Sequence, residues 1–511
     1  MNKLKELALI LKKYRQDYIR VLGNPSCNGS PSKQSKLERF YEMLSNEELT
    51  TDEDAARALG FQSSNTGNYR KLKSYLKKEM LNTLYFLDPK HFDERDNAFQ
   101  ECFRNWTAIK ILYLRQARST AVALSKQVLK IALKHEFSDI VADISLYLRE
   151  HYSTWEADLK QLEFYNNLYH EHIEIKLAKD TAFEYYGWVM YKLKVQSPNE
   201  EISRSALEYY KKLKPLLKKF DNGTIHLYGW FILLIHYLIL NQYRETLKVC
   251  EDAIDFFEKK QEVNNIAIGA FLNQKVTCHI QLKQYEQGRK AIEKAKKLTQ
   301  KGNFNWYTRQ IHGFMLAMHT KHYQEAYLIY RESTHDTHFK FMPSNIRENW
   351  ALFGAYVHYL INLGKIIPVA GEKEFSKFRL ARFLNDVPEY SKDKRGLNVP
   401  ILIIHFLFLI DQGNYDAAFE RLETTEKYCS RYLKKDETFR SNCFIKMLMQ
   451  MPISGFHKTA TLRNAKKIRE KLEEVPLDFA NQAHEVEIIP YEDLWEFAVD
   501  SLGNKRQDGL G

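Results

Sequence analysis

Apolar residues recur every three or four positions along most of this chain, which is the spacing of amphipathic helices. Residues 1–22 show this spacing and predict a first helix. The stretch NPSCNGSPSKQS at residues 24–35 brings Pro, Gly and Ser close together and predicts a linker. Helical spacing resumes directly afterwards in LERFYEML, so the pattern predicts an all-α chain.

Downstream of this linker the pattern predicts a short helix, a turn and a long helix. Thr51 is followed three residues later by Asp54, which is close to a capping box, and Gly60 is placed to end the short helix. A polar, turn-like stretch, SSNTGN, comes next. The long helix is expected to begin near Tyr69 and to end near Leu87.

From about residue 100 to 450 helical stretches follow one another with short polar breaks. Four of them share a pattern in which one helix ends, a polar turn follows, and a Tyr precedes a small or compact residue by three positions. The tyrosines are Tyr243, Tyr285, Tyr323 and Tyr415, and the later residues are Thr246, Gly288, Ala326 and Ala418. We expect each Tyr to pack in the elbow between two antiparallel helices, which the small residue allows to approach closely. One such pair cannot bury its apolar stripe alone, so pairs must stack.

This pattern resembles the tetratricopeptide repeat, whose unit is about 34 residues long. The resemblance covers residues 225–335 and 400–430, whereas residues 100–225 carry weaker repeat marks. The spacings between the tyrosines are longer than that unit and irregular. The resemblance implies an α-solenoid, a right-handed superhelix of antiparallel helix pairs, whose concave face binds a peptide or a protein segment.

The chain is expected to have four regions. Residues 1–35 form an N-terminal helix and linker, residues 36–90 a helix-turn-helix-like module, residues 91–450 the repeat array, and residues 451–511 a C-terminal helical cap with a frayed tail. The block from KDKRGLNVPILII to IIPYEDLWEF also resembles a group of uncharacterised helical-repeat proteins of Bacteroidota-type bacteria. That second resemblance implies no activity.

Composition and charge narrow the class of protein. Only 20 Gly and 12 Pro in 511 residues disfavour a sandwich or barrel, because such folds need many tight turns. The net charge of +11 favours an acidic partner such as nucleic acid, anionic lipid or an acidic protein. The longest apolar run, WFILLIHYLIL, is too short to span a bilayer, so we expect no membrane insertion. The 6 cysteines form no CxxC pair and suit a reducing cytosol, which predicts a cytoplasmic protein.

The long helix after the SSNTGN turn is the first candidate site. Tyr69, Leu72, Leu76 and Met80 share one side of it, and basic side chains spread over the rest. Such a helix can place cations on phosphates and short polar groups on bases. The candidate nucleic-acid contacts are Thr66, Asn68, Arg70, Lys71, Lys73, Lys77 and Lys78. The alternative is a basic, solvated helix that caps the array.

The preceding AAxxLG segment adds a resemblance. Ala55, Ala56, Leu59 and Gly60 resemble the first helix of the helix-turn-helix of sigma-factor region 4. This implies that the long helix enters the major groove of duplex DNA. The turn in this chain is longer than in that motif.

A second basic region is a candidate patch for an acidic partner. Its members are Lys392, Lys394, Arg395, Arg431, Lys434, Lys435 and Arg440. The alternative is a solvated loop followed by a helix end.

Patterns that indicate catalysis are poor. The sequence contains no GxxxxGK[ST], GxGxxG, GxSxG or HExxH motif. His170 and His172 would face opposite sides of a helix, and His135 with Asp139 lacks a third ligand, so neither pair predicts a metal site. We therefore expect no enzyme, no cofactor and no metal.

Two functions stay open at this point. The first is a non-enzymatic interaction scaffold or adaptor with a protein or peptide in its concave face. The alternative is a DNA-binding transcriptional regulator with an N-terminal helix-turn-helix and a ligand- or peptide-sensing array. The scaffold is favoured because the long basic helix runs into LNTLYFL, an apolar segment that we expect to dock on the array.

Overall fold

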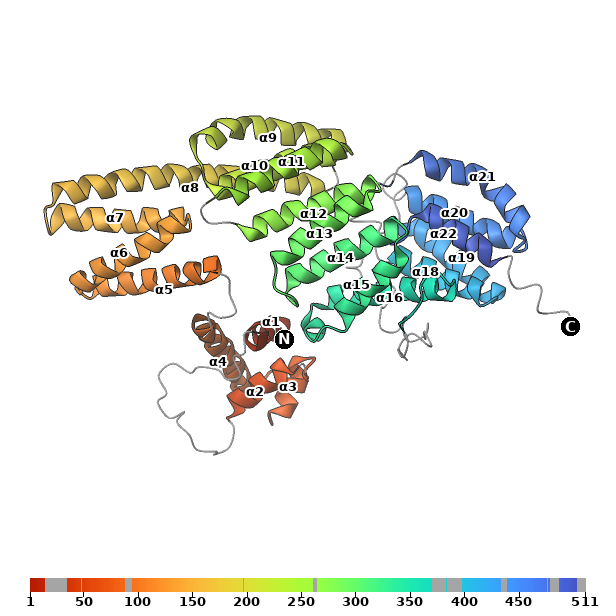
Figure 1. The fold of residues 1–511 in the computed structure, drawn as a ribbon. Coiled ribbons are helices and arrows are strands. Elements are labelled where there is room, and N and C mark those ends of the chain that lie inside the picture. The colour runs from red at the N-terminus through yellow and green to blue at the C-terminus, as the bar shows by residue number, and fades with distance from the viewer. Residues whose placement is uncertain are drawn as a thin grey trace. The chain divides into compact units, whose positions relative to one another are not determined.

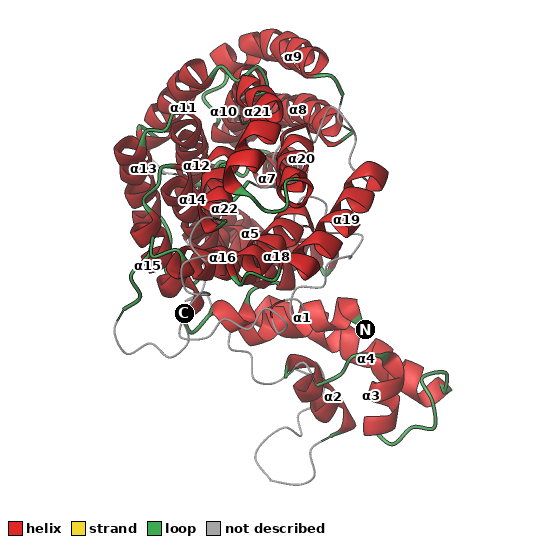
Figure 2. Ribbon diagram, turned by 90° about the vertical axis from the view of Figure 1, so that its right-hand side faces the viewer, coloured by secondary structure: helices red, strands yellow, loops and turns green. Residues whose placement is uncertain are grey.

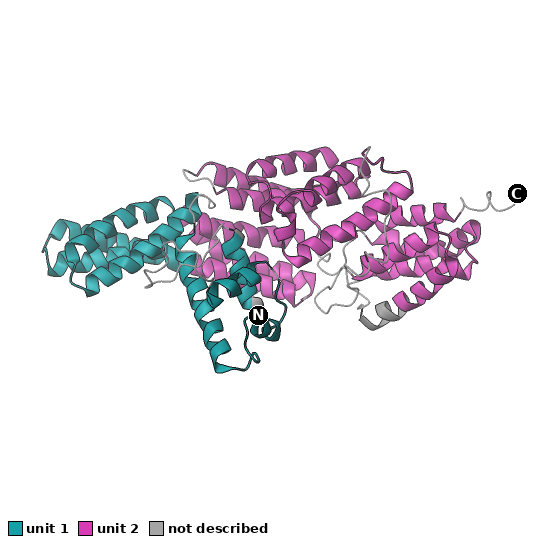
Figure 3. Ribbon diagram, turned by 90° about the horizontal axis from the view of Figure 1, so that it is seen from below, with its two compact units in different colours: residues 1–178 teal, residues 179–511 magenta. Residues whose placement is uncertain are grey.

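The computed structural model describes residues 1–13, 35–46, 48–87, 94–195, 197–260, 264–369, 383, 398–432, 439–475, 477 and 487–502. Within these residues every regular element is a helix, and consecutive helices pack against each other, so the fold is all-α and solenoid-like (Figure 1). The chain divides into two compact units, residues 1–178 and residues 179–511 (Figure 3). None of the described helices is both long and apolar enough to cross a membrane.

The first unit contains two separate hydrophobic cores. One core belongs to α1 (Asn2–Lys13), α2 (Lys36–Ser45), α3 (Asp52–Ala58), α4 (Gly67–Thr83) and a short 3-10 helix, η1 (Leu84–Phe86). The other belongs to α5 (Glu94–Leu114), α6 (Arg118–Lys134), α7 (Ser138–Thr154) and the first part of α8 (Leu159–Lys194). No residue is shared between the two cores as described.

The second unit is built around one continuous core. The unit begins within α8. Its further helices are α9 (Asn199–Lys219), α10 (Gly223–Leu238), α11 (Tyr243–Glu258), α12 (Asn265–Gln281), α13 (Tyr285–Lys297), α14 (Phe304–His319), α15 (Tyr323–Thr334), η3 (Phe339–Phe341), α16 (Ser344–Asn362), α18 (Asn398–Asp411), α19 (Tyr415–Tyr432), α20 (Phe439–Ile453), α21 (Lys458–Glu474) and α22 (Tyr491–Ser501). This core contains buried side chains from Leu234 in α10 to Val499 in α22. In Figure 2, α11, α13 and α15 form an outer row, and α10, α12 and α14 lie inside it.

One turn recurs at the junctions between helices. A residue with positive φ ends the first helix, and the amide of the next residue donates to the carbonyl five positions back, as in Gln284 N to His279 O at 2.9 Å. This is the Schellman arrangement, which satisfies the last carbonyls of a helix. The positive-φ residues of these turns are Gly60, Gln116, Glu136, Asn241, Lys283, Lys321, Gly364, Gly413 and Gly455.

The four marker tyrosines take a fixed place relative to this turn. Each is the first residue of a helix, in α11, α13, α15 and α19 respectively. The compact residues three positions later are buried, and a Cβ added at Gly288 would lie 2.7 Å from Leu316 Cδ2. Leu316 belongs to α14, and His279 Cβ of α12 would lie 3.3 Å from the same added atom, so α13 approaches both neighbouring helices closely at Gly288.

Two of the marker tyrosines also pack beyond their own elbow. Tyr285 stacks on His322 of the next turn, with ring centroids 3.5 Å apart, and Tyr415 stacks on Phe456 at 4.3 Å. Helical side chains tilt toward the N-terminus of their helix, so a tyrosine at the first position projects over the turn. Tyr285 and Tyr415 thus link successive helix pairs, whereas the Tyr243 hydroxyl donates to Asn241 Oδ1 of its own turn at 2.8 Å.

The C-terminal segment is part of the array core. Residues 487–490 form no regular structure and bend at Ile488 and Ile489, and α22 packs on α18, α20 and α21. Ile488, Ile489, Tyr491 and Trp495 are all buried. The region expected to be a terminal cap therefore adds buried side chains to the array core, and α22 lies beside α18 and α20 (Figure 1).

Candidate functional site

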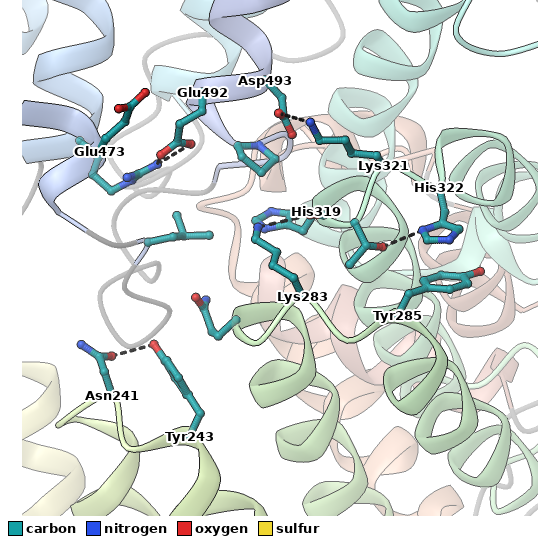
Figure 4. Close-up of a pocket in the computed structure, with 15 residues that line it drawn as sticks. Asn241, Tyr243, Lys283, Tyr285, His319, Lys321, His322, Glu473, Glu492 and Asp493 are labelled. Atoms are coloured by element: carbon teal, nitrogen blue, oxygen red, sulfur yellow. Dashed lines mark hydrogen bonds and ion pairs between the residues drawn. The ribbon is translucent and has the colours of Figure 1, made fainter. Parts of the chain in front are cut away.

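A pocket of about 750 Å³ opens where three successive turns face the C-terminal segment (Figure 4). The α10–α11, α12–α13 and α14–α15 turns supply one side, and α20, α21 and the start of α22 supply the other. The lining residues are Asn241, Tyr243, Gln281, Lys283, Tyr285, His319, Thr320, Lys321, His322, Arg440, Glu473, Leu477, Pro490, Glu492 and Asp493.

Arg440 organises the C-terminal side of this pocket. Its Nε donates to Glu487 Oε1 at 2.6 Å, and its Nη2 donates to Glu492 Oε1 at 2.8 Å. Its Nη1 donates to the carbonyls of Leu472 and Val475 at 3.1 and 2.6 Å. Desolvation alone would lower the pKa of Arg440, but the hydrogen bond and charge of Glu487 outweigh it and raise that pKa. One buried guanidinium therefore holds α21 and the residues around the start of α22 together.

His319 connects the array to the segment of residues 487–490. Its Nε2 lies 2.6 Å from the backbone carbonyl oxygen of Glu487, so Nε2 carries the proton and donates. Burial lowers the pKa of His319 to about 3, and the positive charge of Lys283 contributes to this shift. The imidazole is therefore neutral near pH 7. Beside it, Lys321 Nζ pairs with Asp493 at 2.8 Å.

Lys283 lies beside His319, with acidic residues across the pocket (Figure 4). Its Nζ donates to the backbone carbonyl of His319 at 3.3 Å. Desolvation lowers the pKa of Lys283, although Glu492 and Asp493 raise it in part. Those two carboxylates are engaged by Arg440 and Lys321.

The N-terminal module is the second candidate site. In α3 the side chain of Thr51 accepts from Asp54 N at 3.1 Å, and Asp54 Oδ2 accepts from Thr51 N at 2.9 Å, which confirms the predicted capping box. Tyr69 of α4 is buried, and its hydroxyl donates to Asp52 Oδ1 at 2.8 Å. These contacts fix α4 against α3.

The structure divides the candidate nucleic-acid contacts into two groups. Lys73 pairs with Asp52 at 2.6 Å, and the Thr66 hydroxyl donates to Ser63 O at 3.0 Å, so both are engaged inside the module. The other candidates lie on the exposed face of α4, and Arg70 also donates to Asn65 Oδ1 at 2.8 Å. The exposed candidates are Asn68, Arg70, Lys71, Lys77 and Lys78.

The apolar segment that follows α4 differs from expectation. Leu84 and Leu87 pack into the core formed by α1–α4, and Tyr85 is exposed. The segment therefore completes the core of its own module. The exposed basic face of α4 is left open by it.

Most of the second basic region lies outside the described residues. This applies to Lys392, Lys394, Arg395, Lys434 and Lys435, and Arg431 is described only as part of the α19 backbone. Arg440 is buried inside the array, where it binds the carboxylates given above. Its long-range partners were missed because nothing in the local sequence relates residue 440 to residue 487.

Among the residues that the structure describes, no group of three or more His, Cys, Asp or Glu is placed to hold a metal ion. Comparison with known proteins yields no matching family model and no matching curated protein.

Proposed function

We propose that this chain is a non-enzymatic interaction scaffold of the tetratricopeptide-like type, which binds an extended peptide or protein segment in its helical array. The observation that carries the proposal is that the array already holds residues 487–490 of the same chain. A side chain from a repeat turn, His319, donates to the backbone carbonyl of Glu487, while Ile488 and Ile489 fill apolar space. A surface that holds one non-helical segment of the chain in this way has the chemistry to hold another.

The same proposal includes a cytoplasmic location and kinship with the helical-repeat proteins of Bacteroidota-type bacteria. Stacked helix pairs offer long binding surfaces, which supports a scaffold. The pocket is within the size range of ligand sites, and its polar groups come from several helix pairs.

The scaffold proposal is tested by selecting random dodecamer peptides on the full-length protein. Selected peptides should compete with one another for one site, with affinities in the micromolar range or tighter. A protein that enriches no peptide, or peptides that fail to compete, would contradict the proposal.

A second candidate is a DNA-binding regulator, in which residues 36–90 contact duplex DNA and the array senses a ligand or peptide. The exposed cationic face of α4 on a module with its own core favours it. Neutralised phosphates release counterions, so binding must weaken steeply with salt.

The second candidate is tested with a random-sequence duplex library across a salt series. The variant carries Arg70→Ala, Lys71→Ala and Lys78→Ala, and the matched control carries Lys248→Ala, Lys259→Ala and Lys294→Ala on the array surface. If α4 contacts phosphates, the first variant should lower the log–log salt slope by about 3 and the control should not. Equal slopes for both variants would rule out α4 as the contact.

A further inference from the structure

Two buried polar atoms in the pocket lack a hydrogen-bond partner in the described structure. They are Nδ1 of His319, a residue only 2% exposed, and Nε2 of Gln281. Because Nε2 of His319 carries the proton, Nδ1 is an acceptor. The Gln281 amide nitrogen is a donor. Leaving such groups unsatisfied costs stability, so each points to a group from outside the described chain.

The pocket also contains a cation whose charge is uncompensated at short range. Of its lysines and arginine, Lys321 and Arg440 each pair with a carboxylate within 4 Å. Lys283 makes no ion pair of that length with a described residue, and its Nζ bonds only the His319 carbonyl. Lys283 and Gln281 belong to the same turn, so their free donors come from neighbouring positions.

The chemistry of a matching ligand follows from these three groups. A carboxylate can accept from both an ammonium and an amide nitrogen. The nearby acidic residues Glu473, Glu492 and Asp493 disfavour a ligand of higher negative charge, such as a phosphate. An N–H from the same ligand would satisfy the His319 acceptor. A peptide with an acidic side chain or a free carboxyl end supplies both the carboxylate and the N–H.

The C-terminal segment does not move aside to create this site. Ile488, Ile489, Tyr491 and Trp495 are each at most 2% exposed. Burying four such large side chains stabilises the segment, which fixes it in place. The ligand must therefore enter beside the segment, in the pocket of about 750 Å³.

We infer that the pocket binds a carboxylate of an extended peptide through Lys283 and Gln281, while Nδ1 of His319 accepts a hydrogen bond from the same peptide. This inference rests on the proposed scaffold function and names the ligand class of its site. The peptide lies next to residues 487–490, which already present their backbone to the same turns.

The test uses the full chain and peptides selected as described above. Fluorescence anisotropy measures each peptide against the wild type, Lys283→Met, Lys283→Arg, Gln281→Leu and the control Lys248→Met, which lies outside the pocket. Selected peptides should carry Asp, Glu or an essential free carboxyl end. Lys283→Met should weaken binding about tenfold or more, and Gln281→Leu should weaken it several-fold. Lys283→Arg and Lys248→Met should bind nearly as the wild type does.

A peptide in which the acid is replaced by its amide completes a double-mutant cycle with Lys283→Met. It should lose affinity for the wild type and lose nothing further on Lys283→Met. If peptides are enriched and compete but neither Lys283→Met nor Gln281→Leu weakens them, the carboxylate site is wrong and the scaffold stands. If no peptide is enriched, the scaffold proposal fails as well. Circular dichroism melting of each variant separates lost binding from lost folding.

Discussion

Single residues in this chain show how burial sets chemistry. His319 is buried with its Nε2 proton donated to a carbonyl, and desolvation lowers its pKa to about 3. In the unfolded chain a histidine has a pKa near 6.5. The unfolded state therefore binds a proton that the folded state does not, and stability is lost as pH falls below about 6.5.

This predicts a pH-dependent stability difference for His319→Gln. Between pH 7.5 and 5.5 the wild type should lose about 1.4 kcal/mol more unfolding free energy than the variant, since the variant has no imidazole to protonate. Urea titrations followed by tryptophan fluorescence at both pH values measure it. An identical pH response in the two proteins would show that His319 is solvated and titrates normally.

Substituting the marker tyrosines should destabilise the array by amounts that follow how deeply each side chain is buried. Tyr323 is 8% exposed and packs on Phe497, whereas Tyr285 is only partly buried. Tyr323→Ala should therefore destabilise the array by about 3–5 kcal/mol, and Tyr285→Ala by about half as much. The Tyr323 hydroxyl has no hydrogen-bond partner among described residues, so Tyr323→Phe should be neutral or stabilising. Thermal melting of the three variants gives the order, and a larger loss for Tyr285→Ala would contradict it.

At the scale of elements, the buried ion pair of Arg440 holds α21 and α22 to the array. Arg440→Met leaves Glu487, which is 1% exposed, without its counter-charge. The expected cost is about 3–5 kcal/mol. The control Arg469→Met removes an exposed pair with Glu473 and should cost no more than about 1 kcal/mol. Urea unfolding compares the two, and equal costs would argue against a structural role for the buried pair.

Helix periodicity predicted these elements well, because local spacing is enough to define an amphipathic helix. The turn was found only where a Tyr marks it. The junctions at Gln116 and Glu136 form the same hydrogen bonds without a Tyr, as in Ala117 N to Leu112 O at 2.9 Å, so the repeat marks there are weak. At the first of these junctions the turn conformation is the same as in the repeats, and the buried Ala121 lies three positions into the next helix, where the repeats have their small residue.

The candidate pocket was beyond the reach of the sequence for a different reason. His319 and Glu487 are 168 positions apart, and their contact depends on how the whole array stacks. The sequence indicated a binding surface in general, but the residues that line this pocket, apart from the marker tyrosines Tyr243 and Tyr285 and the patch residue Arg440, were not among the predicted sites. Tertiary packing alone selects Lys283 and Gln281.

At the scale of the whole molecule, separate cores predict separate responses. The core of α1–α4 and the core of the second unit share no described residue. Arg440→Met should therefore speed hydrogen exchange in α18, α20 and α22 while α4 exchanges as in the wild type. Mass spectrometry of peptic fragments reports both regions, and equal acceleration in α4 would mean that the regions unfold as one.

The central claim is that an extended peptide binds in the pocket between the repeat turns and the C-terminal segment. The most direct test replaces Tyr243, which lines the pocket, with photoreactive p-benzoylphenylalanine and illuminates the full chain with a selected peptide. A second protein carries the same group at the exposed Leu328 of α15, which is not among the residues that line the pocket. We predict a crosslink from position 243 that unlabelled peptide abolishes, and none from position 328. A competed crosslink from 328 with none from 243 would contradict the account.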